Sequence, residues 1–200
     1  MVESGIFYAT FVDPLLTGLR KRILPEIKQG ETVIDIACGT GAQVFALANR
    51  ASQVTGVDLS QSMVDFANRR LRKTGLKNVT FHTADATRLE QFGDKSFDVA
   101  AMTLALHQFN PDLYQPILAE MKRIAKRIVI VDYAVPLPNN YAGIGSRIAE
   151  FMAGGEHNHN FKLYYKTGGL NSILPSHGVK IQKSVLIAKR AFQLAVCSTF

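Results

Sequence analysis

The segment VIDIACGTGAQ, residues 33–43, carries the strongest structural signal of the chain. An apolar run of the kind found in buried strands ends in an acidic residue and a loop of small residues, and a helical pattern follows. Gly39 and Gly41 have no Cβ, so this loop lets the backbone approach a ligand closely. The helix that opens after Gly41 would favour a carboxylate or phosphate at its N-terminus. The segment therefore predicts one strand of an open α/β sheet with a ligand at its carboxyl end.

The chain up to residue 135 repeats this alternation of short β-rich runs and helical stretches. Near-continuous Val and Ile content is typical of buried parallel strands, and the helices between them form right-handed crossovers. We expect helices over residues 41–50, 61–73 and 111–125, and parallel strands over residues 32–37, 53–58, 78–84, 97–102 and 127–135.

The chain after Pro136 departs from this rhythm. We expect a cap insertion over about 136–166, followed by a short helix over 167–174. The apolar runs 179–188 and 191–198 are separated by two residues, too few for a crossover, so they predict a β-hairpin. The expected fold class is α/β: a doubly wound, seven-stranded, mostly parallel sheet with helices on both faces and a C-terminal antiparallel hairpin.

Length and composition favour one soluble domain over residues 1–200. Hydrophobic residues make up 47% and charged residues 20% of the chain, which is typical of a globular protein with a large core. Cys38 and Cys197 are too few for a disulfide framework or a zinc cluster. The chain has no apolar run long enough to span a membrane and no signal-peptide pattern at its start, so a cytoplasmic location is expected.

The net charge of +7 suggests an anionic partner. Residues 151–200 hold six basic and one acidic side chain, so the excess lies on the cap exit and the hairpin. This end is the expected contact for an anionic acceptor, and it also admits peripheral contact with a membrane surface. No nucleic acid is expected, because the length leaves no room for a separate recognition domain. The six basic residues are Lys162, Lys166, Lys180, Lys183, Lys189 and Arg190.

Acidic residues mark the ends of three successive strands. Asp35 stands four residues before Gly39, where it would repel a pyrophosphate and attract an ammonium group. Asp58 can accept both hydroxyls of a ribose, and Asp85 can accept from an exocyclic amine. The carboxyl ends of parallel strands line one crevice, so the expected ligand carries an amine, a ribose and a base. A nicotinamide dinucleotide is disfavoured, because Val44 replaces the third glycine of its fingerprint.

The motifs DIACGTG, GVDLS, TADA and FDVAAMTLALHQF, in this order and spacing, resemble those of class I S-adenosylmethionine-dependent methyltransferases. The likeness is greatest to the small type similar to ubiquinone/menaquinone-biosynthesis methyltransferases, and it runs from about Tyr8 to the closing hairpin. It implies a Rossmann-like methyltransferase fold, S-adenosyl-L-methionine as donor, S-adenosyl-L-homocysteine as product, and a small-molecule or lipid-like acceptor. One departure is Ala37, where the family commonly has a glycine. Donor binding is expected to survive this change, and a shifted loop is the alternative.

The resemblance also implies roles for the matching positions. The strand-end acids and the small-residue loop would hold the donor's polar groups, and apolar neighbours would line its base and sulfonium. A leading segment over about 1–28 would form an N-terminal lid or helix, with plain packing as the alternative. The implied donor-binding residues are Asp35, Ala37, Cys38, Gly39 and Gly41 for the methionine part, Asp58 for the ribose, Asp85 and Ala86 for the adenine, Leu59 and Met63 beside its ring, Thr103 within the stretch 101–104 beneath the sulfonium, and Tyr8 in the lid.

Methyl transfer from a sulfonium is an in-line displacement, so the protein mainly aligns the nucleophile and excludes water. Where the acceptor must lose a proton, His107, just past the fourth strand, is the candidate base. The alternative is that His107 packs at the rim of the crevice.

Two further side-chain groups could carry chemistry. His157 and His159 in GGEHNHN could serve a metal with Glu156, but this pair has no dedicated third ligand. A solvated or substrate-facing loop is therefore favoured there, and no metal is predicted. Cys38 is interpreted as a small buried residue rather than a nucleophile. The basic cluster that contains Arg70 is interpreted as a solvated helix face.

Three function classes remain open from the sequence. A methyltransferase acting on a small or lipid-like acceptor is favoured over a protein that binds the donor without catalysis, and over a nicotinamide-dependent oxidoreductase. The strand-end acids hold the donor and not the acceptor, so they do not separate the first two classes. The acceptor is selected by the cap and the leading segment.

Overall fold

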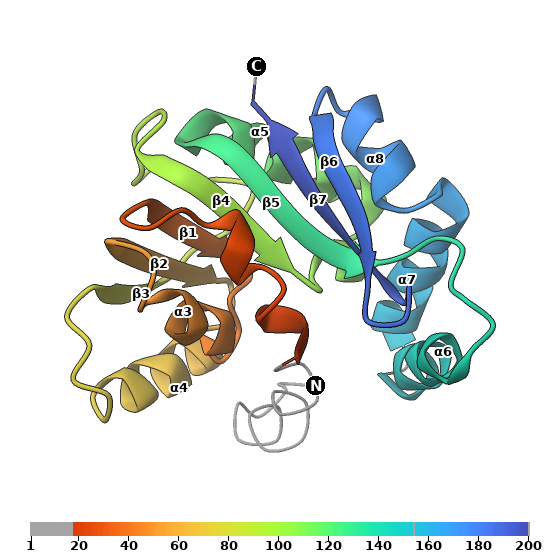
Figure 1. Ribbon diagram of the computed structural model, residues 1–200, viewed down its shortest axis with the longest axis horizontal. Coiled ribbons are helices and arrows are strands. Elements are labelled where there is room, and N and C mark those ends of the chain that lie inside the picture. The colour runs from red at the N-terminus through yellow and green to blue at the C-terminus, as the bar shows by residue number, and fades with distance from the viewer. Residues whose placement is uncertain (1–17, 154, 200) are drawn as a thin grey trace.

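The computed structural model describes residues 18–153 and 155–199. One seven-stranded sheet runs through the molecule in the order β3-β2-β1-β4-β5-β7-β6 (Figure 1). Neighbours among the first five strands pair in parallel, and β7 runs antiparallel to both β5 and β6. The strands are β1 (Thr32–Ile36), β2 (Gln53–Asp58), β3 (Val79–Thr83), β4 (Phe97–Thr103), β5 (Ala125–Tyr133), β6 (Lys180–Ile187) and β7 (Phe192–Ser198). The predicted fold class is confirmed.

Helices and short 3-10 turns surround the sheet (Figure 1). Each predicted crossover helix is present, although α3 is shorter than expected and the third helix begins with a 3-10 turn. The elements are η2 (Leu24–Glu26), α3 (Ala42–Leu47), α4 (Gln61–Leu71), η3 (Leu106–Gln108), η4 (Pro111–Leu113), α5 (Tyr114–Ile124), α6 (Tyr141–Ala153), α7 (Gly155–Thr167) and α8 (Leu170–Ser176). Within the described ranges, none of them is both long and apolar enough to cross a membrane.

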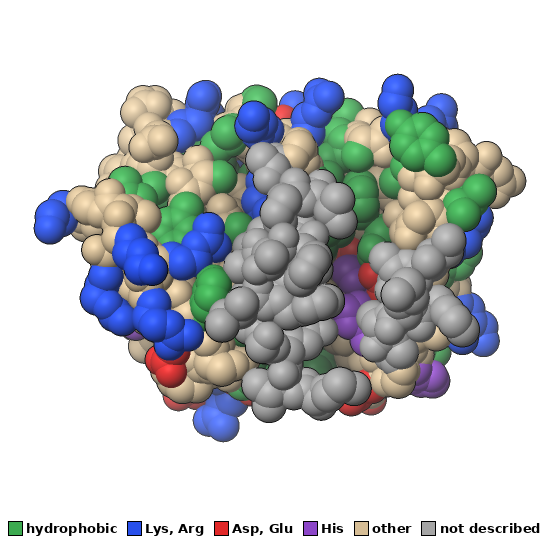
Figure 2. Space-filling model, turned by 90° about the horizontal axis from the view of Figure 1, so that it is seen from below, with side chains coloured by type: hydrophobic (Ala, Val, Ile, Leu, Met, Phe, Trp, Pro, Cys, Tyr) green, Lys and Arg blue, Asp and Glu red, His purple; other side chains and the backbone are tan. Residues whose placement is uncertain are grey.

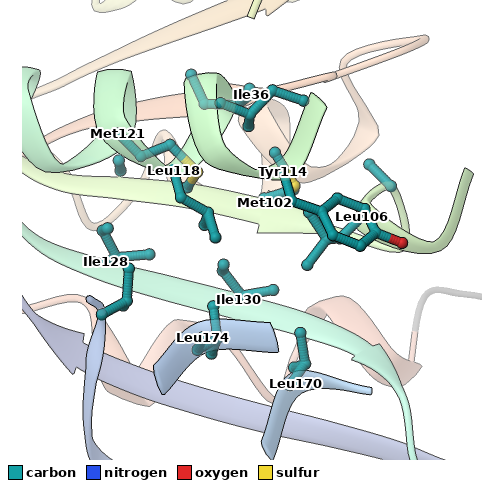
Figure 3. Close-up of a cluster of buried hydrophobic side chains, with 14 of the residues drawn as sticks. Ile36, Met102, Leu106, Tyr114, Leu118, Met121, Ile128, Ile130, Leu170 and Leu174 are labelled. Carbon is teal, nitrogen blue, oxygen red and sulfur yellow. The ribbon is translucent and has the colours of Figure 1, made fainter. Parts of the chain in front are cut away.

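Alternate residues of the central strands feed two separate cores. On one face, Ile34 of β1 joins a cluster with side chains from α5 and α8, and Figure 3 shows part of it around Leu118 and Ile130. On the other face, Val33 joins side chains from α3, α4 and the segment before η2. Successive side chains of a strand point to opposite faces, so helices on both sides bury the central strands, while edge strand β6 stays largely exposed. In such sheets the ligand-binding crevice lies outside the carboxyl ends of the strands.

The C-terminal hairpin is present with a longer turn than the sequence suggests. The strands end at Ile187 and resume at Phe192, so four residues form the turn instead of two. Ala188, Lys189 and Arg190 all take left-handed φ values, between 47° and 70°. Edge strand β6 carries Lys183, which forms an ion pair of 2.6 Å with Glu26, and part of the basic excess is therefore used within the fold.

The cap consists of two helices, α6 and α7, and α7 packs against both α6 and η3. The expectation of a loop at GGEHNHN was wrong, because α7 begins at Gly155 and includes the rest of this segment. Buried Phe161 and Tyr164 lie on the inner side of α7, which tertiary packing stabilises although its first turn is polar. The following helix also differs from expectation, since α8 begins at Leu170 and contains Pro175 in its last turn.

Candidate active site

The loop between β1 and α3 turns through three left-handed residues. Ala37, Gly39 and Gly41 have φ values of 56°, 53° and 76°. A Cβ on Gly41 would lie 2.5 Å from the ring of Phe81, so this position needs glycine for space as well as for backbone conformation. Ala37 takes the left-handed conformation that glycine favours, although the family commonly has a glycine there.

Asp35 lies at the end of β1 directly before this loop. Its side chain is only 2% exposed, and its Oδ1 has no hydrogen-bond partner among the described residues. Burial, reinforced by the nearby Asp58 carboxylate and opposed by Arg20, raises the pKa of Asp35 to about 7. A buried carboxylate without a partner is costly, and a ligand ammonium group would satisfy it.

Asp58 at the end of β2 holds the glycine loop. Its Oδ2 accepts a hydrogen bond of 2.7 Å from the backbone N–H of Gly39, and its Oδ1 accepts one of 2.9 Å from that of Ser60. Each carboxylate oxygen can accept a second hydrogen bond, so both remain available to ribose hydroxyls. Leu59 beside it is 72% exposed, and Met63 lies buried in the first turn of α4.

Asp85 follows β3 and is exposed. Its Oδ1 accepts hydrogen bonds from the backbone N–H and the hydroxyl of Thr87, at 2.8 and 2.7 Å. These bonds fix the turn that carries Asp85 and half-buried Ala86. The three acids thus end three neighbouring strands, as the sequence indicated.

Cys38 lies between Ala37 and Gly39 in the glycine loop and is buried. Burial and the nearby carboxylates of Asp35 and Asp58 raise the pKa of its thiol well above the ordinary value. A thiol that stays protonated is a poor nucleophile.

Two more buried polar side chains near the start of α3 and the end of β4 lack partners. Neither the amide oxygen nor the amide nitrogen of Gln43 has a hydrogen-bond partner in the described part of the chain, and the same holds for the hydroxyl of Thr103. Buried polar groups are normally paired, so these atoms indicate a polar ligand. Gln43 was not singled out from the sequence. Its polar type in the first turn of α3, where the buried Val44 and Leu47 follow, is the signal that was available.

Arg70 does not lie on a purely solvated helix face, as the sequence suggested. Its guanidinium donates a hydrogen bond of 3.2 Å to the carbonyl oxygen of Thr40 and lies 4.9 Å from the ring centroid of Phe45. The side chain therefore connects α4 to the glycine loop and to α3.

His107 is buried beside the end of β5. Its Nδ1 lies 2.6 Å from Oδ1 of Asp132, and its backbone N–H donates to Oδ2 of the same carboxylate at 3.1 Å. The two bonds fix both the ring and the 3-10 turn that carries it. Nε2 is consequently the ring nitrogen that faces the cap.

Glu150 of α6 and His157 of α7 complete a cluster with His107. Nε2 of His107 lies 3.5 Å from Oε1 of Glu150, and Nε2 of His157 lies 2.9 Å from Oε2. The hydroxyl of Tyr133 also donates to Oε1 at 2.8 Å. Figure 2, which views the molecule from below relative to Figure 1, shows histidine atoms and acidic atoms next to one another near the centre of that side. His159 is exposed and takes no part in the cluster.

Opposite charges stabilise one another inside this cluster. Burial opposes the imidazolium of His107, but Asp132 and Glu150 outweigh it and raise its pKa to about 9. Burial likewise opposes the carboxylate of Glu150, but the two histidines and Tyr133 lower its pKa to about 2.

Among the residues proposed from the sequence, Tyr8 lies outside the described residues.

Residues 33–127 match a family model described as a methyltransferase domain. The matched residues, just under half of the chain, form a methyltransferase domain, and this match supports placing the chain among the class I S-adenosylmethionine-dependent methyltransferases. The match argues against the nicotinamide-dependent alternative. It also agrees with the small-residue loop, the strand-end acids and the sheet order described above.

Curated methyltransferases are related to this chain over part of their length. An O-methyltransferase of Penicillium expansum is 35% identical over 127 residues, which are 62% of this chain and 46% of that protein. A demethylmenaquinone methyltransferase of Lactobacillus johnsonii is 33% identical over 115 residues, 54% of this chain and 46% of that protein. The chain thus spans about half the length of these relatives.

Solved structures share the fold at low sequence identity. A SAM-dependent methyltransferase from Aquifex aeolicus has a TM-score of 0.65 at 20% identity and covers 96% of this chain and 100% of its own. The geranyl diphosphate C-methyltransferase from Streptomyces coelicolor A3(2) has a TM-score of 0.67 at 14% identity and covers 100% of this chain and 85% of its own. These likenesses support the methyltransferase fold.

Proposed function

We propose that this chain transfers the methyl group of S-adenosyl-L-methionine to a small-molecule acceptor by in-line displacement. The observation that carries the proposal is the buried carboxylate of Asp35 at the glycine loop, whose Oδ1 has no hydrogen-bond partner among the described residues. The ammonium group of the donor's methionine part would pair with it and offset the cost of its burial.

The other donor contacts follow from the positions of the strand ends. Asp58 would accept the ribose hydroxyls while it keeps its bonds to the loop, and Asp85 would accept from the adenine amine. Exposed Leu59 would cover the adenine ring, together with Met63. The hydroxyl of Thr103 would lie at the sulfonium end. When bound, the donor supplies a methyl group already activated for displacement.

The acceptor would bind on the cap side of the crevice. A cavity of about 450 Å³ lies between α6 and α7 and is lined by apolar side chains and three cations. The ring of Phe161 lines this cavity and also packs 6.1 Å from the ring of His107, centroid to centroid, so the cavity adjoins the buried cluster. This lining supports a partly apolar acceptor with a negative group. The cavity is lined by Leu137, Arg147, Phe161, Lys162, Tyr165 and Lys166.

His107 remains the candidate base. Asp132 occupies its Nδ1, so Nε2 is the atom that could take a proton from an acceptor. Because its pKa is raised to about 9, only the fraction of His107 that has lost its proton could act in this way at lower pH. This arrangement resembles other catalytic histidines, in which a carboxylate fixes the orientation of the ring.

Transfer of labelled methyl groups tests the proposal. Wild-type protein would be mixed with labelled donor and a set of small anionic and lipid-like acceptors, with Asp35→Asn and His107→Gln as variants. We expect label in an acceptor with the wild type and a loss of roughly 10²–10⁴-fold in rate with His107→Gln where the acceptor must lose a proton. Donor binding without transfer to any acceptor would instead favour a binding protein without catalysis.

A further inference from the structure

We infer that His107, Glu150 and His157 bind one divalent transition-metal ion of the zinc type. Each residue offers one ligand atom, and these atoms lie within 4.8 Å of one another. Imidazole nitrogen and carboxylate oxygen bond zinc at about 2.0–2.2 Å in tetrahedral geometry, so two ligand atoms of one ion lie about 3.3–3.6 Å apart. For all three side chains to bind one ion, Oε2 of Glu150 and Nε2 of His157 would separate slightly from 2.9 Å, and the wider pairs would move closer together.

The side chains behind the ligands are arranged as in metal sites. Asp132 holds Nδ1 of His107 at 2.6 Å, which leaves Nε2 to the ion. A histidine ligand usually has its other nitrogen bound to a carboxylate or carbonyl in this way. The hydroxyl of Tyr133 donates to Oε1 of Glu150 at 2.8 Å and orients the third ligand.

Two of the ligand atoms also lack a satisfactory partner in the ion-free arrangement. Oε2 of Glu150 and Nε2 of His157 lie 2.9 Å apart, but neither atom has a hydrogen bond of acceptable geometry within the described part of the chain. A cation bound to both would satisfy the two atoms at once. The structure therefore offers a reason for the two histidines and the glutamate to lie together, although the side chain of His157 is 26% exposed.

The ligand count suggests what the ion does, and this step rests on the proposed function. Three protein ligands leave a fourth tetrahedral position open, as in catalytic zinc sites. The ion would lie where the cap meets the sheet, because His107 comes from η3, Glu150 from α6 and His157 from α7. With Nε2 of His107 bound to the ion, the ion would take the place of that nitrogen in activating the acceptor, and an acceptor hydroxyl or thiol in the open position would release its proton to solvent more easily. The resulting anion would then attack the methyl carbon, and the electron pair of the breaking bond would stay on the donor's sulfur.

Titration of untagged, chelator-treated protein with Co²⁺ tests the site, read by visible absorption and repeated by calorimetry with Zn²⁺. His157→Ala is the test variant, and His159→Ala is its matched control, because His159 is exposed on the same helix and lies outside the cluster. We expect one equivalent of metal to bind to the wild type and to His159→Ala, and at least 100-fold weaker binding to His157→Ala. Asp132→Asn should weaken binding by about 10–100-fold.

Absence of stoichiometric metal binding to the wild type, or equal losses in the two histidine variants, would overturn the inference and leave an ion-free hydrogen-bond network in its place. Binding of S-adenosyl-L-homocysteine is measured on every variant as a check on folding. Donor binding without metal binding removes only the metal site. Metal binding without methyl transfer to any acceptor removes only the proposed function.

Discussion

Ala37 holds a left-handed backbone conformation with a φ of 56°. This region costs an alanine about 1–2 kcal/mol relative to its ordinary conformations, and glycine adopts it freely. Asp58 and the backbone hydrogen bond from Cys38 N–H to the Val57 carbonyl hold the loop to β2 in this conformation.

Ala37→Gly should therefore raise the free energy of unfolding by roughly 0.5–1 kcal/mol, after the greater freedom of glycine in the unfolded chain is subtracted. Urea unfolding measures this change. Ala42→Gly in the first turn of α3 is the control and should lower stability by about the same amount. Destabilisation by both variants would contradict the strained alanine.

Asp35 should couple donor binding to pH. Its pKa is raised to about 7, so its charge is present above that pH and lost below it. The affinity for S-adenosyl-L-homocysteine should then rise between pH 5 and 7 by up to roughly tenfold per unit, and level off until the ligand's own amine loses its proton. Asp35→Asn should flatten this rise. Calorimetry over this pH range measures it, with Arg20 and Asp58 as the neighbouring charges that the variant leaves in place.

The same shift makes a prediction for stability. A carboxyl whose pKa is higher in the folded than in the unfolded state favours folding at low pH. The contribution of Asp35 is complete below its ordinary pKa of 3.8 and is lost as the pH rises through about 7. Asp35→Asn should therefore gain stability relative to the wild type between pH 4 and 7, and a constant difference across this range would refute the assignment.

The strand-end acids could be predicted because a strand pattern fixes where its carboxyl end lies. Their partners could not. The bonds from Asp58 to Gly39 and Ser60, and the missing partner of Asp35, depend on the exact path of the loop. Sequence spacing does not determine that path.

Among the elements, α4 supports the donor site through one side chain. Arg70 reaches the Thr40 carbonyl and the Phe45 ring, while its neighbour Arg69 is exposed. Arg70→Ala should lower the free energy of unfolding by about 1–2 kcal/mol through loss of a charged hydrogen bond and a cation–π contact. It should also weaken donor binding severalfold, because the glycine loop loses a support. Denaturation and calorimetry should show changes within about 0.5 kcal/mol for Arg69→Ala.

The structure of the cap helices could not be predicted from the residue pattern. The first residues of α7, Gly155–Asn160, are mostly polar, so the sequence did not indicate a helix there. Phe161 and Tyr164 form part of the buried side of this helix. The sequence paired His157 with His159, but a helix turns neighbours two apart to different sides. His157 instead lies close to Glu150 and His107. These three residues are far apart in the sequence, so no short motif could predict their proximity.

Across the whole molecule, the seven strands were predictable because their apolar runs are separated by helical patterns, by the irregular segment 84–96 or by one short turn. The helices on the two faces of the sheet form two hydrophobic cores, and side chains of α5 pack in one of them. Leu118 is fully buried there, so Leu118→Ala should cost about 2–5 kcal/mol in urea unfolding, while partly exposed Leu113→Ala should cost far less. Similar losses for both would contradict the packing shown in Figure 3.

The assignment of S-adenosyl-L-methionine as the donor rests on the glycine loop, the strand-end acids and the match to the methyltransferase family model. Calorimetry with S-adenosyl-L-homocysteine tests it most directly. The wild type should bind one equivalent. Asp58→Ala should weaken binding by about 1–3 kcal/mol, roughly 5- to 150-fold, through loss of charged hydrogen bonds to the ribose and the loop. The control Asp65→Ala, on the exposed side of α4, should bind as the wild type does. No binding by the wild type, or an unchanged affinity in Asp58→Ala, would contradict the account.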